Sequence, residues 1–206
     1  VDASSGIEVG TEKAWKLLEK HRRPRFIFIN KMDKENVDFE KLINELRQEF
    51  GDKIYPFALP IGKSEDFKGF VNVRDEVAYK YVDGERQEIP LRDNEKQEIE
   101  DIRESLMEKV AETDDELMMK YFDGEPFTTE EIAKGLRTSV ANGDLVPVFL
   151  GSAEKAIGMD YLLSVIQRYI PSPKDVGKVK AYKDGEEIER NIDINEPFSA
   201  IVFKTI

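Results

Sequence analysis

The sequence predicts an α/β fold built on an open sheet, and two features of the chain support this prediction. Residues 25–29 and 146–150 are apolar runs of strand length, and each ends in a loop of small and polar residues. Apolar side chains recur at helical spacing after these loops, near residues 39–50 and 162–170. Because the strand ends of an open α/β sheet face the ligand crevice, the two loops form the candidate site.

The composition is typical of a soluble, cytoplasmic protein. Hydrophobic residues make up 40% of the 206 residues, and the sequence contains neither a signal peptide nor an 18-residue apolar run, so we expect no membrane partner. Cysteine is absent, which excludes disulfides and thiolate metal sites. The net charge of −12 argues against a protein that binds phosphate backbones, so we expect no direct DNA binding.

The negative charge is concentrated in one segment. Residues 65–145 contain 23 acidic and 11 basic residues, whereas the rest of the chain contains 20 of each. This segment separates the two candidate loops in sequence, and the pairing of those loops requires its ends to lie close together. We therefore expect residues 65–145 to form an acidic insertion that projects as a separate lobe.

The first 64 residues predict alternating strands and helices. Residues 1–3 resemble the end of a strand, and residues 8–20 a helix, with an apolar stripe of Ala14, Leu17, Leu18 and His21. Residues 39–50 predict a second amphipathic helix that ends at Gly51. Residues 54–60 are extended, and their prolines suit an edge strand. Gly62, Lys63 and Ser64 resemble the end of a phosphate-binding loop, but its first glycine and its helix are missing.

The insertion predicts strands followed by helices. Residues 70–73, 77–81 and 86–89 alternate like strands, with a hairpin turn at Asp83-Gly84. A helical stripe then contains Ile99, Ile102, Leu106 and Val110. Residues 113–116 and 128–131 each predict a capping box that begins a further helix, and Gly143 ends the last one.

The end of the chain predicts a helix, a linker and a new domain. Leu162, Leu163, Ile166 and Ile170 define the helix, which prolines 171 and 173 terminate. Residues 171–191 predict a polar linker with a hairpin turn at Asp184-Gly185. Residues 197–206 alternate like the first strand of a further domain, which begins near residue 192.

The candidate site begins at Asn30-Lys31-Met32-Asp33, directly after the first predicted strand. The two carboxylate oxygens of Asp33 match the two N–H donors on the Watson–Crick edge of guanine. Lys31 can lay its aliphatic stem along the base, and Asn30 can tie the loop to its neighbours. The alternative is an ordinary polar turn between a strand and a helix, since Asn and Asp are common turn residues.

The second loop, Gly151-Ser152-Ala153, strengthens the interpretation of the first loop as part of a guanine site. A Ser-Ala loop after the next strand of a GTPase sheet offers a backbone N–H to the guanine O6 atom, and here that N–H belongs to Ala153. Each loop alone is a weak signal, but two loops of this chemistry in this order indicate a guanine site made by Asn30, Lys31, Asp33, Ser152 and Ala153.

In order and spacing, Asn30–Asp33 and residues 149–153, 170–173 and 197–204 resemble translation elongation factor G and its paralogues over essentially the whole chain. The resemblance implies a partial P-loop-GTPase-type sheet with an α+β insertion, followed by the first strand of a β-barrel domain. Residues 1–64 and 146–170 would then be the C-terminal half of the GTPase domain, and 65–145 the insertion subdomain. Residues 171–191 would be the linker and 192–206 the start of the barrel.

The resemblance also implies a function, that of a ribosome-associated GTPase that binds GTP and GDP and drives translocation. Ribosomal-protection proteins share the pattern more loosely. The phosphate loop, the switch threonine, the magnesium motif and the catalytic histidine would lie upstream, so His21 does not match that histidine. We therefore expect no catalytic residue and no metal ligand in residues 1–206, with the Mg²⁺ ligands outside this chain, and no catalysis by this stretch alone.

A second interpretation is a protein-docking module that acts through the acidic insertion. In elongation factor G the insertion lies toward the ribosomal stalk protein, which makes that protein the candidate partner. An acidic helical surface that is simply solvated is equally consistent with the sequence. A kinase or dehydrogenase is disfavoured, because neither Gly-x-Gly-x-x-Gly nor a complete phosphate loop occurs.

Overall fold

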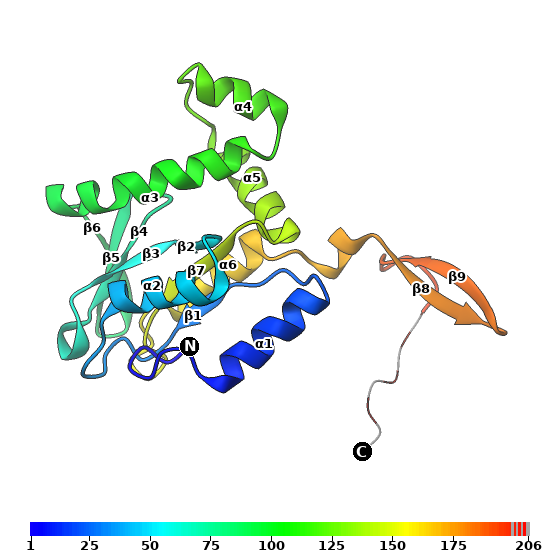
Figure 1. Cartoon of the computed structure of the whole chain (residues 1–206), viewed down its shortest axis with the longest axis horizontal. Helices are drawn as coiled ribbons and strands as arrows, with labels where there is room; N and C mark the ends of the chain where they lie inside the picture. Colours follow the sequence, from blue (N-terminus) through cyan, green and yellow to red (C-terminus); the bar gives the residue numbers. More distant parts are fainter. Residues whose placement is uncertain (199, 201, 203, 205–206) are drawn as a thin grey trace. The chain divides into compact units, whose positions relative to one another are not determined.

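A computed structural model describes residues 1–198, 200, 202 and 204. The chain divides into two units, residues 1–170 and residues 171–206, and each is described by itself. The first unit contains two sheets and six α-helices among the described residues (Figure 1). The fold is mixed α/β, as predicted, with a parallel sheet and a separate antiparallel one.

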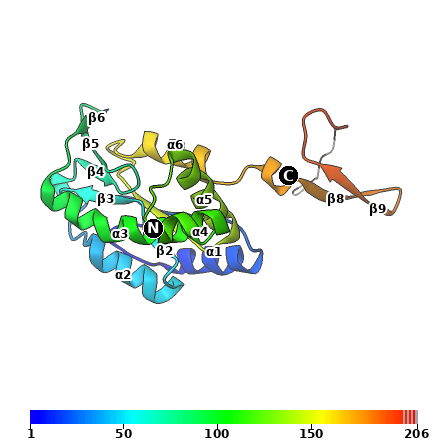
Figure 2. The same ribbon diagram turned by 90° about the horizontal axis from the view of Figure 1, so that it is seen from above.

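The first sheet has three parallel strands in the order β1-β7-β2. β7 (Val146–Leu150) is buried along its whole length and lies between β1 (Ile27–Ile29) and β2 (Ile54–Pro56). Ile29 pairs with Leu150 on one side of β7, and Ile54 pairs with Val146 on the other. Figure 2 shows helices α1 and α2 on one face of this sheet and α6 on the other. β2 lies at an edge, as its proline predicts.

Helix α1 (Val9–Lys20) packs on its neighbours through Trp15 rather than through the predicted stripe. Leu17 is 58% exposed, and Ala14 and His21 are also exposed, so this part of the prediction was wrong. The reason is the size of the indole ring, which stacks on Phe50 of α2 at a centroid distance of 4.2 Å. One large aromatic contact therefore sets the buried face of the helix.

Helix α2 (Phe39–Phe50) agrees with the sequence. The Asp38 side chain accepts a hydrogen bond from Lys41 N and caps the first turn, while Gly51 ends the helix at φ 93°. Leu42, Ile43, Leu46 and Phe50 are buried against the sheet, as their spacing predicts. Residues 1–3 run beside β1, where Asp2 forms a parallel bridge with Asn30.

The second sheet is antiparallel, with the order β3-β4-β5-β6. Its edge strand β3 (Ala58–Ile61) follows β2 after one residue, so this sheet begins before residue 65. β4 (Gly69–Asn72), β5 (Val77–Val82) and β6 (Glu85–Ile89) follow the prediction. The predicted turn between β5 and β6 has positive φ at both Asp83 and Gly84, which suits a tight hairpin. Ser64 begins a short 3₁₀ turn, η1 (Ser64–Asp66), rather than the helix of a phosphate loop.

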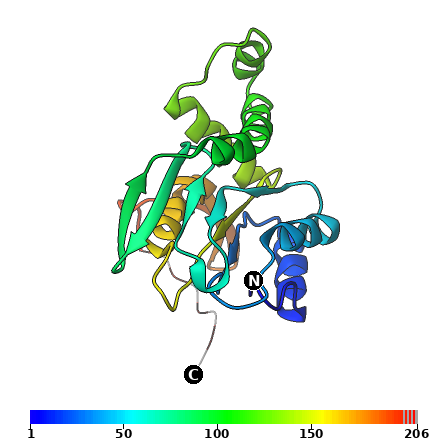
Figure 3. The ribbon, with the colours of Figure 1, turned by 90° about the vertical axis from the view of Figure 1, so that its left-hand side faces the viewer.

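Three helices follow the second sheet. α3 (Asp93–Ala111) leads to α4 (Asp115–Phe122), which projects on the side of the unit opposite α1 (Figures 1 and 3). α5 (Thr129–Asn142) returns to the first sheet and ends at Gly143 with φ 82°. The capping box at Thr128 is confirmed, but the one at Thr113 is wrong. Asp114 caps α4 by accepting from Glu116 N, because the Thr113 hydroxyl donates to Val110 O instead.

Helix α6 (Met159–Tyr169) covers the other face of the first sheet through Tyr161, Val165 and Tyr169. The predicted stripe was wrong here too, because Leu163 is 68% exposed. Phe70 of the insertion packs on Tyr161 at 4.7 Å between ring centroids. The expected separate lobe is therefore not observed for the whole insertion, since its sheet shares a core with the segments on either side.

The second unit contains a hairpin within the stretch expected to be a polar linker. η2 (Pro173–Val176) precedes β8 (Lys178–Lys183), which pairs with β9 (Glu186–Asn191). The turn lies at Asp184-Gly185, as expected, with positive φ at both residues. The strand expected over residues 197–206 includes residues that lie outside the described part of the chain.

Candidate functional site

The two predicted loops lie side by side at the carboxyl ends of β1 and β7. Gly151 N donates to Ile29 O at 3.0 Å, and Met32 N donates to Gly151 O at 3.1 Å. No side chain fits at position 151, because a Cβ atom there would lie 2.4 Å from Ile157 O. Backbone contacts between neighbouring parallel strands thus bring together two loops that are about 120 residues apart in sequence.

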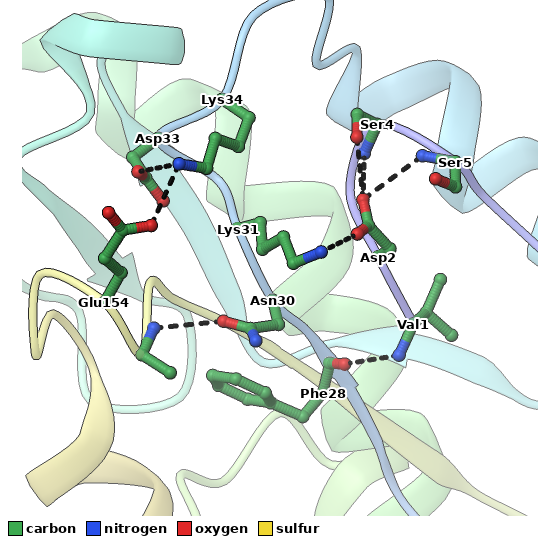
Figure 4. A network of polar contacts seen from close by, with 11 residues as sticks. Val1, Asp2, Ser4, Ser5, Phe28, Asn30, Lys31, Asp33, Lys34 and Glu154 are labelled. Atoms are coloured by element: carbon green, nitrogen blue, oxygen red, sulfur yellow. Dashed lines mark hydrogen bonds and ion pairs between the residues drawn. The ribbon is translucent and has the colours of Figure 1, made fainter.

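Asn30 connects three segments at the end of β1. Its backbone N–H donates to Val1 O, and its carbonyl accepts from Ala3 N, both at 2.8 Å. Its side-chain Oδ1 accepts from Ala153 N at 3.0 Å (Figure 4). As expected, Asn30 therefore ties the first loop to its neighbouring segments. The Ala153 N–H is already engaged, so a contact with guanine O6 would have to share it with Asn30.

Asp33 is buried, with 7% of the residue exposed. Its Oδ1 atom is fully enclosed and has no hydrogen-bond partner among the described residues. Burial disfavours its charge, but the Ser152 hydroxyl, its own backbone N–H and the charges of Lys34 and Lys155 outweigh that effect. They hold the pKa of Asp33 below its usual value, so the carboxylate is ionised at neutral pH.

Ser152 stabilises the second loop from within. It is fully buried, and its backbone exchanges two hydrogen bonds with Ile157, each 3.0 Å long. Its Oγ atom accepts from Lys155 N at 3.2 Å. The loop is therefore a closed turn that is held by its own hydrogen bonds.

Charged residues that the sequence analysis did not assign complete the site (Figure 4). Lys34 Nζ lies 2.9 Å from Glu154 Oε2 and 3.9 Å from Asp33 Oδ2, so this pair bridges the two loops. Lys31 Nζ lies 2.6 Å from Asp2 Oδ2. Neither Glu154 nor Asp2 belongs to the Asn30–Asp33 loop. Only the pairing of their segments with β1 brings these two acids near that loop.

Other features of the chain lie apart from these loops. A cleft of about 750 Å³ opens between α2, α3 and β3. Of the four residues Asn30–Asp33, only Met32 lines this cleft. His21 is exposed at the end of α1. Within the described ranges, no group of three or more His, Cys, Asp or Glu side chains is placed to hold a metal ion. No helix in the same part of the chain combines the length and apolar character needed to cross a bilayer.

Comparison with known proteins agrees with this geometry. The model of the elongation factor Tu GTP binding domain matches residues 1–172. An elongation factor G-like protein from Thermotoga maritima is 37% identical, over 100% of this chain and 30% of that protein. A crystal structure of a protein from Thermus thermophilus matches with a TM-score of 0.79 and 34% identity, over 86% of this chain and 26% of that one.

The chain thus spans about 30% of the length of the curated relative that it matches. The family model covers most of the 206 residues, including both loops of the candidate site. The parallel sheet, the insertion between β2 and β7 and the two adjoining loops are the structural counterpart of that match. The chain therefore belongs to the elongation factor G-like family of translational GTPases.

Proposed function

We propose that the two loops hold the base of a guanine nucleotide, with Asp33 as the residue that selects guanine. The buried, ionised carboxylate of Asp33 supports this most strongly, because one of its oxygens has no partner among the described residues. A buried acceptor without a donor costs roughly 1–3 kcal/mol. The N1–H and 2-amino groups of guanine are a matching pair of donors.

The neighbouring residues have separate roles in this proposal. Asn30 holds the second loop against the first, and Ser152 shapes that loop and supports the ionised form of Asp33. Lys31 covers a face of the base with its stem, and Ala153 shares its backbone N–H between the Asn30 side chain and the O6 atom. When bound, GTP supplies the phosphoryl group that this family hydrolyses, and the residues named here contact only the base.

At the level of the whole protein, we propose a ribosome-associated GTPase that acts in translocation. A ribosomal-protection paralogue is the alternative, and membership of the elongation factor G-like family supports both. The acidic insertion is then a docking surface for a ribosomal protein, with the stalk protein as the candidate. The exposed acidic residues at the start of α4 support this role.

The base-reading role can be tested by NMR titration of the chain with GDP, which detects affinities as weak as the millimolar range. We expect shifts at the amides of both loops. Asp33→Asn should weaken GDP binding at least tenfold, since one acceptor becomes a donor that faces a guanine donor and the cost is about 1.4 kcal/mol or more. The same variant should gain affinity for xanthosine diphosphate, whose 2-oxo group accepts.

Glu35→Gln is the matched control, because Glu35 is an exposed acid in the same loop. Like Asp33→Asn, it removes one negative charge, but it leaves Asp33 unchanged, so GDP affinity should change less than twofold. Equal GDP affinity of Asp33→Asn and the wild type would exclude Asp33 as the base reader.

A further inference from the structure

Lys31 is constrained in both its backbone and its side chain although it is exposed. It adopts a left-handed backbone conformation, with φ 66°, two residues after the end of β1. Its side chain is half exposed, yet its ammonium group is held by Asp2 Oδ2 at 2.6 Å. Figure 4 shows the Lys31 side chain directed toward Asp2 and away from Asp33 and Lys34. A long lysine side chain at the surface normally samples many rotamers, so this contact restricts its freedom.

Asp2 is itself held from several directions. Its Oδ1 atom accepts from Ser4 N at 2.9 Å, from Ser4 Oγ at 2.7 Å and from Ser5 N at 3.2 Å. Its backbone is fixed beside Asn30, because Ala3 N donates to Asn30 O. The Lys31 ammonium and the Ser4 hydroxyl hold the pKa of Asp2 far below its usual value. The carboxylate therefore stays charged and fixed across the neutral and mildly acidic range.

Each lysine that flanks Asp33 has its own acidic partner. Lys34 is bound by Glu154 from the second loop, and Lys31 is bound by Asp2 from the segment before α1. Without Asp2, the Lys31 side chain would be free to sample other rotamers, and ordering it against a bound base would cost more entropy.

We propose that Asp2 is a positioning residue for guanine binding, which fixes the Lys31 stem for contact with the base. This inference rests on the proposed guanine site and adds a residue outside both loops. Asp2 acts only through Lys31. Asp2 should therefore affect the contact between Lys31 and the face of the base, whereas Asp33 affects the hydrogen bonds to the Watson–Crick edge of the base.

A double-mutant cycle with Asp2→Asn and Lys31→Met tests the proposal. Methionine keeps an unbranched apolar stem but has no charge. By NMR titration with GDP, Asp2→Asn alone should weaken binding about three- to tenfold, in the range of one ordinary net hydrogen bond. In the Lys31→Met background the same change should have no further effect. The loss should be the same for the diphosphates of guanosine, inosine and xanthosine.

Two further variants separate positioning from folding. Ser4→Ala removes one donor to Asp2 but keeps its charge, and should weaken GDP binding less than Asp2→Asn does, and only when Lys31 is present. Asp52→Asn removes an exposed acid after α2 and should leave binding unchanged. Amide spectra of every variant should retain the wild-type dispersion away from residues 1–8 and 30–34.

The proposal is overturned if Asp2→Asn binds GDP like the wild type, or if its loss persists in full in the Lys31→Met background. In the second case Asp2 acts through the shape of its own loop. These outcomes differ from a failure of the guanine site itself. In that case the wild type would show no shifts in either loop, and Asp33→Asn would have no effect.

Discussion

At the scale of single residues, the Trp15 side chain connects helix α1 to several neighbouring segments of the first unit. It stacks on Phe50, and the Arg25 guanidinium lies 4.1 Å from its ring centroid. Lys53 approaches the ring at 5.2 Å, and Glu19 pairs with both cations. Aromatic stacking and cation–π contact thus hold α1 against α2 and the start of β1.

Trp15→Ala should therefore strongly destabilise the first unit. Truncation of a buried aromatic residue costs about 3–5 kcal/mol, and here it also leaves Arg25 without its ring contact. Urea unfolding followed by circular dichroism measures the change. Leu17→Ala on the same helix is the control, and because Leu17 is 58% exposed it should cost less than about 0.5 kcal/mol. Equal costs for the two variants would contradict the observed helix orientation.

The buried faces of α1 and α6 were mispredicted for the same reason that Asp2 and Glu154 were not assigned. In each case the deciding contacts come from segments that are distant in sequence. Spacing alone ranked Leu17 and Leu163 as buried, but the large rings of Trp15 and Tyr161 took the buried positions because their partners come from distant segments. The two loops of the candidate site could be located from the sequence because each is contiguous and ends a strand. Asp2 and Glu154 could not, since only strand pairing places them beside Lys31 and Lys34.

At the scale of elements, helix starts followed the sequence where a local motif fixed them. The capping box of α5 could be predicted because Thr128 and Glu131 contact each other's backbone N–H groups. Glu131 also pairs with Lys120 of α4 at 2.6 Å, so the cap joins two helices. Between the insertion and the helix after the second loop, Asp160 of α6 pairs with Arg86 of β6 at 2.9 Å and accepts from the Tyr81 hydroxyl of β5. Such contacts between elements have no local sequence signal.

The α5 cap should make the stability of the insertion depend on pH. The Lys120 ammonium and the Thr128 backbone hold the pKa of Glu131 below its usual value of 4.5. The ionised cap is therefore fully stabilising above pH 4.5 and is lost as the pH falls through the lower pKa of the folded state. Urea unfolding from pH 7 to pH 3 should show Glu131→Gln to be less stable than the wild type at neutral pH, with the gap closing in acid.

Thr128→Ala provides the control for that series. It removes the neutral half of the same cap, at a cost of about 1 kcal/mol at neutral pH, but keeps the carboxylate. Its stability should still fall in acid. A gap between Glu131→Gln and the wild type that stays constant down to pH 3 would show that the carboxylate does not stabilise the helix.

At the scale of the whole molecule, the acidic charge of the insertion gathers where α4 begins. Asp115 and Glu116 are exposed there, beside Glu112 and Asp114. Such a surface repels ribosomal RNA and favours a partner with basic groups. If it docks to a ribosomal protein, association should weaken as salt rises, since charges are screened beyond about 8 Å at physiological ionic strength.

The test replaces Asp115 with Asn and Glu116 with Gln but keeps Asp114, whose side chain caps α4. Binding of the chain to ribosomes, or to isolated stalk protein, should weaken and lose part of its salt dependence. Asp184→Asn with Glu186→Gln removes two exposed acids from the hairpin and should leave binding unchanged. Unchanged binding in both pairs, with no salt dependence, would mean that the acidic surface is only solvated.

The strand order of the first sheet has a consequence for how the chain reaches its native state. The central strand, β7, is made last, about 90 residues after the edge strand β2 that it pairs with. During synthesis from the N-terminus, β1 and β2 therefore have no central strand to pair with until β7 has been synthesised. Closing so long a loop is entropically costly, and contacts of such high sequence separation form slowly. Until residue 150 has been synthesised, the edges of β1 and β2 that pair with β7 lack their partner, and unpaired strand edges of this kind invite association with other chains.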